Sequence, residues 1–182
     1  KLPFEDNIRL CQEVVTMAHS KGVLVEGEID HIPGSSEKHG ENIVSSNFTD
    51  IGKAKEFIEK TGVDILAVFI GNAHGVFSEE EKLNIPKLQE INTAMPETFF
   101  SLHGGSGVAP EDVSEALKYG IVKVNVNTEM RVAYRETLEN VLRGDPEEVA
   151  MYKLLPPVIE AVEKIVEEKI LLFGSSGNYE EK

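Results

Sequence analysis

Residues 98–128 constrain the fold more than any other part of this sequence. They read TFFSLHGGSG, then a short helical pattern, then IVKVNVNT, which predicts two strands joined by one helix. Two strands that are joined through a helix run parallel in one sheet. Along the whole chain, strand and helix patterns alternate four times after an opening helix at residues 5–20. We therefore expect an α/β fold with a parallel sheet and helical crossovers.

Polar residues recur at every second position of these two strands. Because side chains alternate along a strand, Ser101 and His103 share one face of the first strand, and Lys123, Asn125 and Asn127 share one face of the second. A parallel strand covered by protein on both sides is normally apolar throughout. The pattern is typical of a TIM (β/α)8 barrel whose interior carries chemistry near one rim, and four strands amount to half of such a barrel.

Glycines follow the first of these strands directly. Gly104, Gly105 and Gly107 allow positive φ and a close approach of backbone N–H groups to a ligand. The loops after the last two strands of a (β/α)8 barrel commonly bind phosphate, and the N-terminus of a following helix adds further donors. In the alternative interpretation, the glycines only form a turn and the asparagines only cap a helix. The histidine before the glycines and the polar repeat favour an anion site.

Two acidic residues share one face of an earlier strand, predicted at residues 23–29. Glu26 and Glu28 would point into a barrel, where carboxylates are unfavourable unless they meet a metal, a base or a ligand. An edge strand with its acids in water is the alternative. By contrast, residues 30–47 show no period and predict a long surface loop, in which His31 and His39 are expected to be solvated rather than metal ligands.

Two histidines are expected on the same rim of the sheet. A continuously apolar strand at residues 64–70 leads into His74, and His103 ends the strand after it. A catalytic zinc ion typically takes three protein ligands, so two histidines need a third, for which Glu28 is a candidate. A metal beside a phosphate site suggests a sugar-phosphate substrate. The ion would polarise the substrate carbonyl and acidify the adjacent C–H for a carboxylate base.

Further helices are expected on either side of these strands. Thr49 or Asp50 caps a helix that ends near Gly62, and Pro86 lies near the start of the next. Another helix follows Thr128, and a last one runs over residues 147–172 with an interruption at residues 156–157.

Composition sets the remaining bounds. The chain has 182 residues, of which 41% are hydrophobic, and we expect one domain over residues 1–182 with a helical extension from about residue 146. A complete barrel needs about 250 residues, so half of one would expose two sheet edges and require a partner or a further N-terminal segment. The net charge of -14 argues against nucleic acid and anionic membranes as partners. The single Cys11 fits a cytoplasmic location, and no run of about 18 apolar residues could span a membrane.

Four motifs in order carry a resemblance to a known family. Glu26-Gly-Glu28, Gly71-Asn-Ala-His74-Gly75, Leu102-His103-Gly-Gly-Ser106-Gly107 and Lys123-Val-Asn-Val-Asn127-Thr128 resemble motifs of the zinc-dependent class II fructose-bisphosphate aldolases, a group that includes tagatose-bisphosphate aldolases. The segment that begins at Lys169 resembles the C-terminus of that family. The resemblance implies the C-terminal half of a barrel, about strands 5 to 8 plus the C-terminal helices, and a lyase of glycolysis.

The resemblance also implies a set of site residues. His74, His103 and Glu28 would bind the metal, which would be Zn²⁺, with a monovalent cation as a second candidate ion. Dihydroxyacetone phosphate would contact the residues Gly75, Gly104, Gly105, Ser106, Asn125, Val126, Asn127 and Thr128. The catalytic aspartate and a further zinc histidine are expected upstream of Lys1. Glu37 is the candidate for exchange of the C1 proton, and Lys153 stands near the position at which the family has an arginine for the second phosphate.

The predicted reaction is the reversible cleavage of a ketose 1,6-bisphosphate, with fructose 1,6-bisphosphate favoured, to dihydroxyacetone phosphate and glyceraldehyde 3-phosphate. The chain would require a complementary N-terminal half for activity, and a homo-oligomer is also expected. Two alternatives remain open. Lys123 could act as a Schiff-base nucleophile in a metal-independent aldolase. Alternatively, the chain could be a non-catalytic phosphate-binding module that assembles half-barrels.

Overall fold

The computed structural model describes residues 2–32, 34–38, 48–76 and 82–178, with only the backbone described at residues 34–38 and 76. Four parallel strands form the main sheet in chain order: β1 (Glu26–Glu28), β3 (Ile65–Val68), β5 (Phe99–Leu102) and β6 (Ile121–Val124). A second, two-stranded parallel sheet joins β2 (Gly34–Lys38) to β4 (His74–Val76). The predicted α/β fold with a parallel sheet is therefore confirmed, whereas closure into a barrel stays a prediction.

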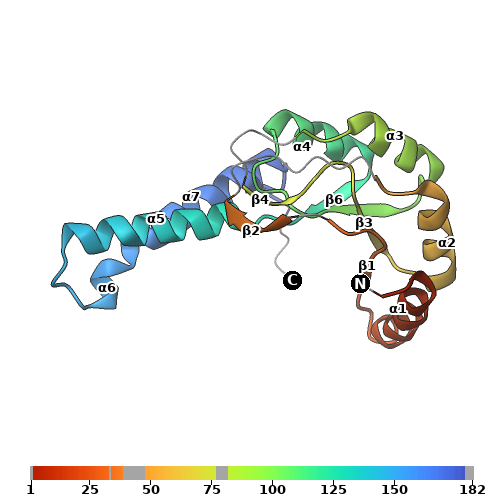
Figure 1. The fold of residues 1–182 in the computed structure, drawn as a ribbon, viewed down its shortest axis with the longest axis horizontal. Helices are drawn as coiled ribbons and strands as arrows, with labels where there is room; N and C mark the ends of the chain where they lie inside the picture. The colour runs from red at the N-terminus through yellow and green to blue at the C-terminus, as the bar shows by residue number, and fades with distance from the viewer. Residues whose placement is uncertain (1, 33, 39–47, 77–81, 179–182) are drawn as a thin grey trace.

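One face of the main sheet is apolar and covered by helices. Leu66, Val68, Phe100 and Leu102 lie on this face and are each 0% exposed. The covering helices are α1 (Phe4–His19), α2 (Ile51–Thr61), α3 (Ile85–Ala94) and α4 (Pro110–Ala116), the last followed by a 3₁₀ turn at Leu117–Tyr119. They form an arc along one side of the sheet (Figure 1). Burial of these side chains against the helices forms the core, because removing apolar surface from water is the main favourable term in folding.

The opposite face carries polar residues, as the sequence pattern predicts. The ladder pairs Glu28 with Ala67, Ala67 with Ser101, and Ser101 with Lys123. Residues paired across a sheet share a face. Glu26, which lies two residues before Glu28, is on this face as well. The sheet therefore has an apolar face against the helices and an opposite face that carries Glu26, Glu28, Ser101 and Lys123.

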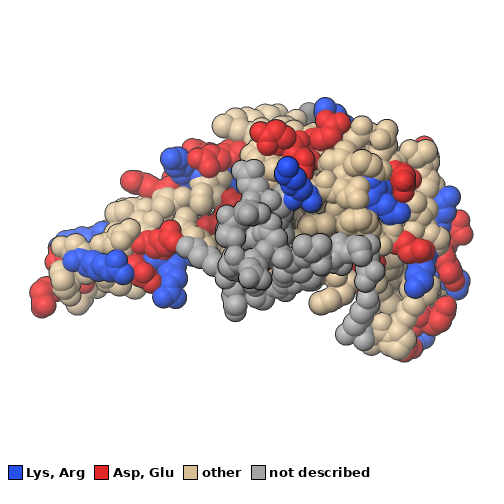
Figure 2. All heavy atoms as spheres, turned by 45° about the horizontal axis from the view of Figure 1, so that its top comes forward, with Lys and Arg blue, Asp and Glu red and all other residues tan. Residues whose placement is uncertain are grey.

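The last three helices form an arm. α5 (Thr128–Gly144) and α7 (Pro156–Leu172) pack against each other and extend away from the sheet, with the short α6 (Met151–Leu154) at the far end (Figure 1). Arg135 and Arg143 of α5 both pair with Glu139, each one helical turn away from it. Acidic and basic side chains are interspersed over the arm and over the sheet with its covering helices, on the face seen in Figure 2. No helix in the described ranges combines the length and apolar composition that a membrane span requires.

The cap of α2 resolves one pair of alternatives. Asp50, not Thr49, is the N-cap, because its Oδ1 accepts a hydrogen bond from the Lys53 backbone N–H at 2.8 Å. Thr49 is instead buried, where its hydroxyl donates to Asp30 and accepts from the Phe69 N–H at 2.8 Å. Thr49 therefore ties the end of β1 to the segment after β3, and Asp50 begins the helix.

Three expectations about element bounds are wrong. Residues 30–47 are not a structureless loop, because β2 lies within them; its ladder partner β4 is far along the chain, and Gly-Ser-Ser-Glu-Lys has no local strand pattern. The first strand covers only Glu26–Glu28 and is therefore shorter than residues 23–29. Val23 and Leu24 precede it and are 54% and 69% exposed. The last helix does not begin at residue 147. Instead α6 begins at Met151, and the helix is interrupted at Leu155, before α7 begins at Pro156. His39 lies outside the described residues.

Candidate functional site

A cavity of about 460 Å³ opens where β5 and β6 end and α5 begins. It is lined by His74, Gly75, Gly104, Ser106, Val124, Asn125, Val126, Asn127 and Thr128. The structure thus gathers all the predicted substrate residues except Gly105 around one space. Gly105 supports the wall instead, because its N–H donates to the Asn125 carbonyl at 2.9 Å. What the cavity binds stays a prediction.

Two glycines are required by packing in this wall. Gly104 has φ of +63°, and a Cβ built on it would lie 2.0 Å from the Ala73 carbonyl oxygen. A Cβ on Gly105 would lie 2.6 Å from Cγ1 of Val124. The loop at residues 104–107 therefore packs tightly between Ala73, which precedes His74, and Val124 at the end of β6. Since the two walls touch, the cavity shape is set by backbone packing.

Two backbone N–H groups converge on Ser106, which lines the cavity. Ser106 is 2% exposed, and its Oγ accepts from the N–H groups of Asn127 at 3.2 Å and Glu129 at 3.4 Å. A hydroxyl that accepts in this way keeps its own proton to donate. Thr128 begins α5, a helix of 17 residues whose N-terminal dipole favours an anion. The Asn127 side chain makes no capping bond to the described part of α5, so the alternative role as a helix cap is not supported there.

The strand that carries the two asparagines is shorter than expected. β6 ends at Val124, although the Asn125 N–H still donates to the Leu102 carbonyl at 2.9 Å. Asn127 has φ of -143° and ψ of -53°, which is not extended backbone. The chain therefore turns at Asn127 into α5, and the predicted alternation of faces does not reach this residue.

His74, which lines this cavity, lies next to His103. Their ring centroids are 6.1 Å apart, with the ring planes inclined at 64°. Nε2 of His103 lies 2.6 Å from Oε1 of Glu26, which leaves Nδ1 as the nitrogen that could face a metal. A carboxylate that holds one imidazole nitrogen while the other faces an ion is the usual support of a metal-binding histidine. The arrangement fits two of the three protein ligands that a catalytic zinc ion takes.

Glu26 is singled out with Glu28 by the sequence, but its partners are not predicted from it. Its two oxygens bridge His103 and Lys123, whose Nζ lies 2.9 Å from Oε2. Burial alone would raise the pKa of Glu26, but the hydrogen bonds from His103 and Lys123 together outweigh burial and lower the pKa below its usual value. Glu26 is therefore anionic at neutral pH. The Glu26-Gly-Glu28 motif signalled both acids, but the period of the strand could not tell which one reaches His103.

The environment of His74 favours its neutral form. Burial lowers the pKa of His74, and repulsion from His103 and His31 lowers it further, against an opposing attraction from Glu28. Only the neutral imidazole has a lone pair for a metal, so at neutral pH His74 is in the form that a ligand needs.

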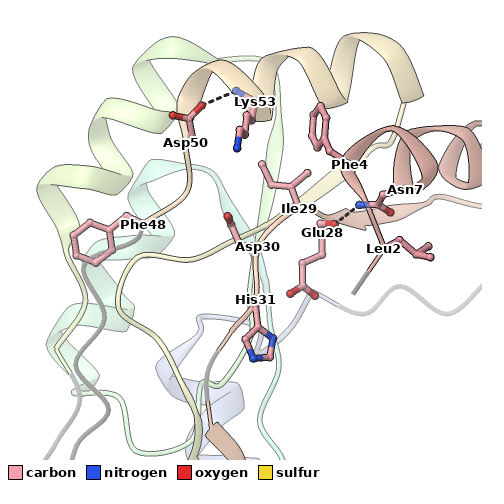
Figure 3. A pocket seen from close by; sticks show the side chains of 10 residues that line it. All are labelled: Leu2, Phe4, Asn7, Glu28, Ile29, Asp30, His31, Phe48, Asp50 and Lys53. Carbon is pink, nitrogen blue, oxygen red and sulfur yellow. Dashed lines mark hydrogen bonds between the residues drawn. The ribbon is translucent and has the colours of Figure 1, made fainter.

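Glu28 faces a different space. It lines a second cavity of about 560 Å³ beside β1, together with Leu2, Phe4, Asn7, Ile29, Asp30, His31, Phe48, Asp50 and Lys53. Figure 3 shows the Glu28 carboxylate beside the His31 ring, while Asp50 caps the helix above them. Within the described residues, no three His, Cys, Asp or Glu side chains lie close enough together to hold a metal ion. The role of Glu28 as the third ligand therefore stays a prediction.

Comparisons with known proteins agree with these features. A sequence model of the family described as "Fructose-bisphosphate aldolase class-II" matches residues 1–178. The chain belongs to the class II fructose-bisphosphate aldolase family. It is 36% identical over 178 residues to a fructose-bisphosphate aldolase of Staphylococcus aureus and 34% identical over 178 residues to that of Geobacillus stearothermophilus. Each match covers 96% of this chain and 60% of the relative, so the chain spans about 60% of the length of these class II aldolases.

A solved aldolase has the same fold. The YdjI aldolase from Escherichia coli K12 superimposes with a TM-score of 0.76 at 35% identity, over 98% of this chain and 60% of that one. The family resemblance of the four motifs is thus confirmed.

Three residues singled out for other roles in an aldolase have distinct environments: Lys123 for the Schiff-base alternative, and Glu37 and Lys153 for the class II reaction. Lys123 is 46% exposed and its Nζ is paired with Glu26, whereas a Schiff-base nucleophile must have its amine free to attack the carbonyl. Glu37 lies on β2, where only the backbone is described. Lys153 lies in α6 at the far end of the arm and pairs with Glu148 (Figure 1). Among the described residues that line the cavity, Lys153 is not present.

Proposed function

We propose that this chain is the phosphate-binding part, and part of the metal site, of a class II aldolase. The enzyme would reversibly cleave a ketose 1,6-bisphosphate, with fructose 1,6-bisphosphate favoured, to dihydroxyacetone phosphate and glyceraldehyde 3-phosphate. We call the cavity of about 460 Å³ at the ends of β5 and β6 the anion cavity. The observation that carries the proposal is the position of His74, which lines this cavity while its ring centroid lies 6.1 Å from that of His103. A substrate whose phosphate fills the cavity would bring its carbonyl end toward both imidazoles.

The phosphate of the substrate would be held by neutral donors. The Ser106 hydroxyl can donate its proton, and Thr128, the first residue of α5, lines the cavity at a helix N-terminus, where backbone N–H groups favour anions. Such donors bind a dianion without carrying charge of their own. Dihydroxyacetone phosphate is the product that this cavity would hold in either direction of the reaction.

His74 and His103 would hold the zinc ion, with Glu28 as the candidate third ligand. The ion would polarise the substrate carbonyl as a Lewis acid and so acidify the adjacent C–H. Glu26 would orient His103 through its 2.6 Å contact with Nε2 and make the ring more basic. Lys123 would balance the charge of Glu26, so that the carboxylate supports His103 without competing for the metal.

The remaining groups would come from a complementary N-terminal half. The family places a further zinc histidine and the aspartate that handles the C4 hydroxyl proton in a strand that precedes the segment resembling residues 1–4. We propose that this half pairs with the outer edges of β1 and β6, closes an eight-stranded barrel and covers the cavity beside β1. Glu37 remains the candidate for proton exchange at C1.

Binding measurements test the proposal on the chain itself. Isothermal titration with dihydroxyacetone phosphate should give saturable binding that weakens about fivefold or more in Ser106→Ala, because one hydrogen bond to a charged group is lost. Ser175→Ala, at an exposed position, is the matched control. Equilibrium dialysis against Zn²⁺ should show loss of binding in His74→Ala and His103→Ala but not in His19→Ala. A wild-type chain that takes up neither zinc nor the triose phosphate would refute the proposal.

A non-catalytic phosphate-binding module is the second candidate. The comparisons do not favour it over an aldolase. An aldolase assay of the chain alone and with a complementary half, combined with sedimentation, separates the two. Turnover without any added segment would exclude the module. Turnover that requires the added half, is lost with a chelator and returns with zinc would support the aldolase.

A further inference from the structure

An ion pair lies directly behind the glycine loop of the anion cavity. Glu129, the second residue of α5, turns its side chain back toward the loop after β5, where Oε1 accepts from the Gly107 N–H at 2.8 Å. Nζ of Lys169, from the last turn of α7, lies 2.7 Å from Oε2 and 3.0 Å from Oε1. The side chains of Glu129 and Lys169 are 22% and 20% exposed, so solvent screens this pair only in part.

The Glu129 carboxylate fixes the loop from outside the cavity. Its side chain holds the Gly107 amide, and its own backbone N–H reaches Ser106 Oγ at 3.4 Å. Since Ser106 lines the cavity, Glu129 connects both ends of the loop segment at residues 106–107 to the first turn of α5. A change at this position would move the serine hydroxyl that we expect to contact phosphate.

A carboxylate at this position also creates an electrostatic problem. Uncompensated, its negative charge would repel a phosphate dianion in the adjacent cavity and reduce the effect of the helix N-terminus. Lys169 supplies the opposite charge at 2.7 Å from Oε2, while Oε1 accepts from Gly107. The pair as a whole is neutral, so the loop is held by a strong charged acceptor while the cavity keeps its preference for anions.

We propose that Glu129 and Lys169 form a neutral clamp that positions the phosphate loop and maintains the phosphate affinity of the cavity. The proposal rests on the proposed function, in which the cavity binds a phosphate monoester. It assigns Lys169, in the C-terminal segment of the chain, a role at the site, and it makes the docking of α7 against α5 a condition for phosphate binding. Glu129 and Lys169 are positioning residues, because they act through Ser106 and Gly107.

A double-mutant cycle tests the electrostatic part. Titration with inorganic phosphate and with dihydroxyacetone phosphate compares the wild type, Lys169→Met, Glu129→Gln and the double variant. Lys169→Met should bind phosphate about tenfold more weakly, because it leaves Glu129 uncompensated at short range. The double variant should return to within about twofold of the wild type, because the glutamine carries no charge while its amide oxygen can still accept from Gly107. Lys164→Met removes the same charge from an exposed position of α7 and should change little.

Hydrogen exchange of the Gly107 amide tests the positioning part without any ligand. Exchange should be slow in the wild type and in Glu129→Gln, and at least about tenfold faster in Glu129→Ala, which removes the acceptor. Unchanged phosphate affinity in Lys169→Met, or a double variant as weak as Lys169→Met, would overturn the clamp while the phosphate site stands. Failure of the wild type to bind either phosphate would overturn the proposed function and the electrostatic role. The positioning role would then be tested only by hydrogen exchange of the Gly107 amide.

Discussion

Replacing Gly104 by alanine should show how tightly the two halves of the candidate site are locked together. Gly104 has φ of +63°, and a Cβ there would lie 2.0 Å from the carbonyl oxygen of Ala73, the residue before His74. Real Cβ contacts do not fall below 3.0 Å, so the backbone of one loop must move by about 1 Å. Neither loop can yield by rotating a side chain, because the atom in contact belongs to the backbone.

The expected magnitude has two parts. An alanine at positive φ costs about 1–2 kcal/mol in conformational energy. Overpacking against an unyielding neighbour adds about 1–3 kcal/mol. Gly22→Ala is the matched control, because Gly22 has φ of +69° but nothing within 4 Å of its Cβ. Urea unfolding should therefore show Gly104→Ala to be less stable than Gly22→Ala by about 1–3 kcal/mol, and dihydroxyacetone phosphate should bind it more weakly.

The difference between the two variants isolates the contact from the strain. If both lose the same free energy of unfolding within about 0.5 kcal/mol, the loops are not wedged together and the reasoning about a fixed cavity fails. If Gly104→Ala is less stable but binds the triose phosphate as well as Gly22→Ala does, the contact contributes to the fold and not to the site.

Two further predictions concern stability. Hydrogen bonds from His19, at 2.9 Å, and from the Val25 N–H, at 2.7 Å, lower the pKa of Asp64. A lowered carboxyl pKa adds stability that is present above the ordinary pKa of about 4 and is lost as the pH falls through the folded-state pKa. The free energy of unfolding in urea should therefore vary less for Asp64→Asn than for the wild type between about pH 5 and 3. Asp50→Ala should reduce the free energy of unfolding by about 1 kcal/mol through loss of the α2 cap, and Asp50→Asn should be nearly neutral; equal losses in both would contradict the capping role.

The sequence predicted the candidate site better than it predicted the element bounds. Glycines and polar residues at the ends of two strands could be read as a rim, because parallel strands place their carboxyl ends at one edge. The structure duly gathers Ser106, Asn125 and His74 around one cavity. The β2 strand could not be predicted, since its only described partner, β4, lies about forty residues away and its own residues carry no period.

The pairings of charged side chains were beyond the reach of periodicity. Glu26 and Glu28 share a strand face, and only the three-dimensional position of the His103 ring decides that Glu26 is its partner. Glu129 reads as an ordinary acidic residue in the first turn of a helix, which the helix dipole favours in any case. Its contact with Gly107 depends on the loop folding back, and its contact with Lys169 depends on α7 returning along α5.

These pairings explain why the site is organised before any ligand binds. Glu26 links β1 to His103 after β5 and to Lys123 on β6. Asn72, after β3, donates from Nδ2 to the His103 carbonyl at 2.9 Å, and it is itself fully buried. Polar contacts thus link β1, β6 and the segments after β3 and β5, in addition to the ladder bonds. Because buried polar groups lose free energy when left unpaired, a shift of any one strand would break contacts with its neighbours. The rim is therefore expected to keep its geometry within the four-stranded unit, so that a complementary half would meet a site already formed.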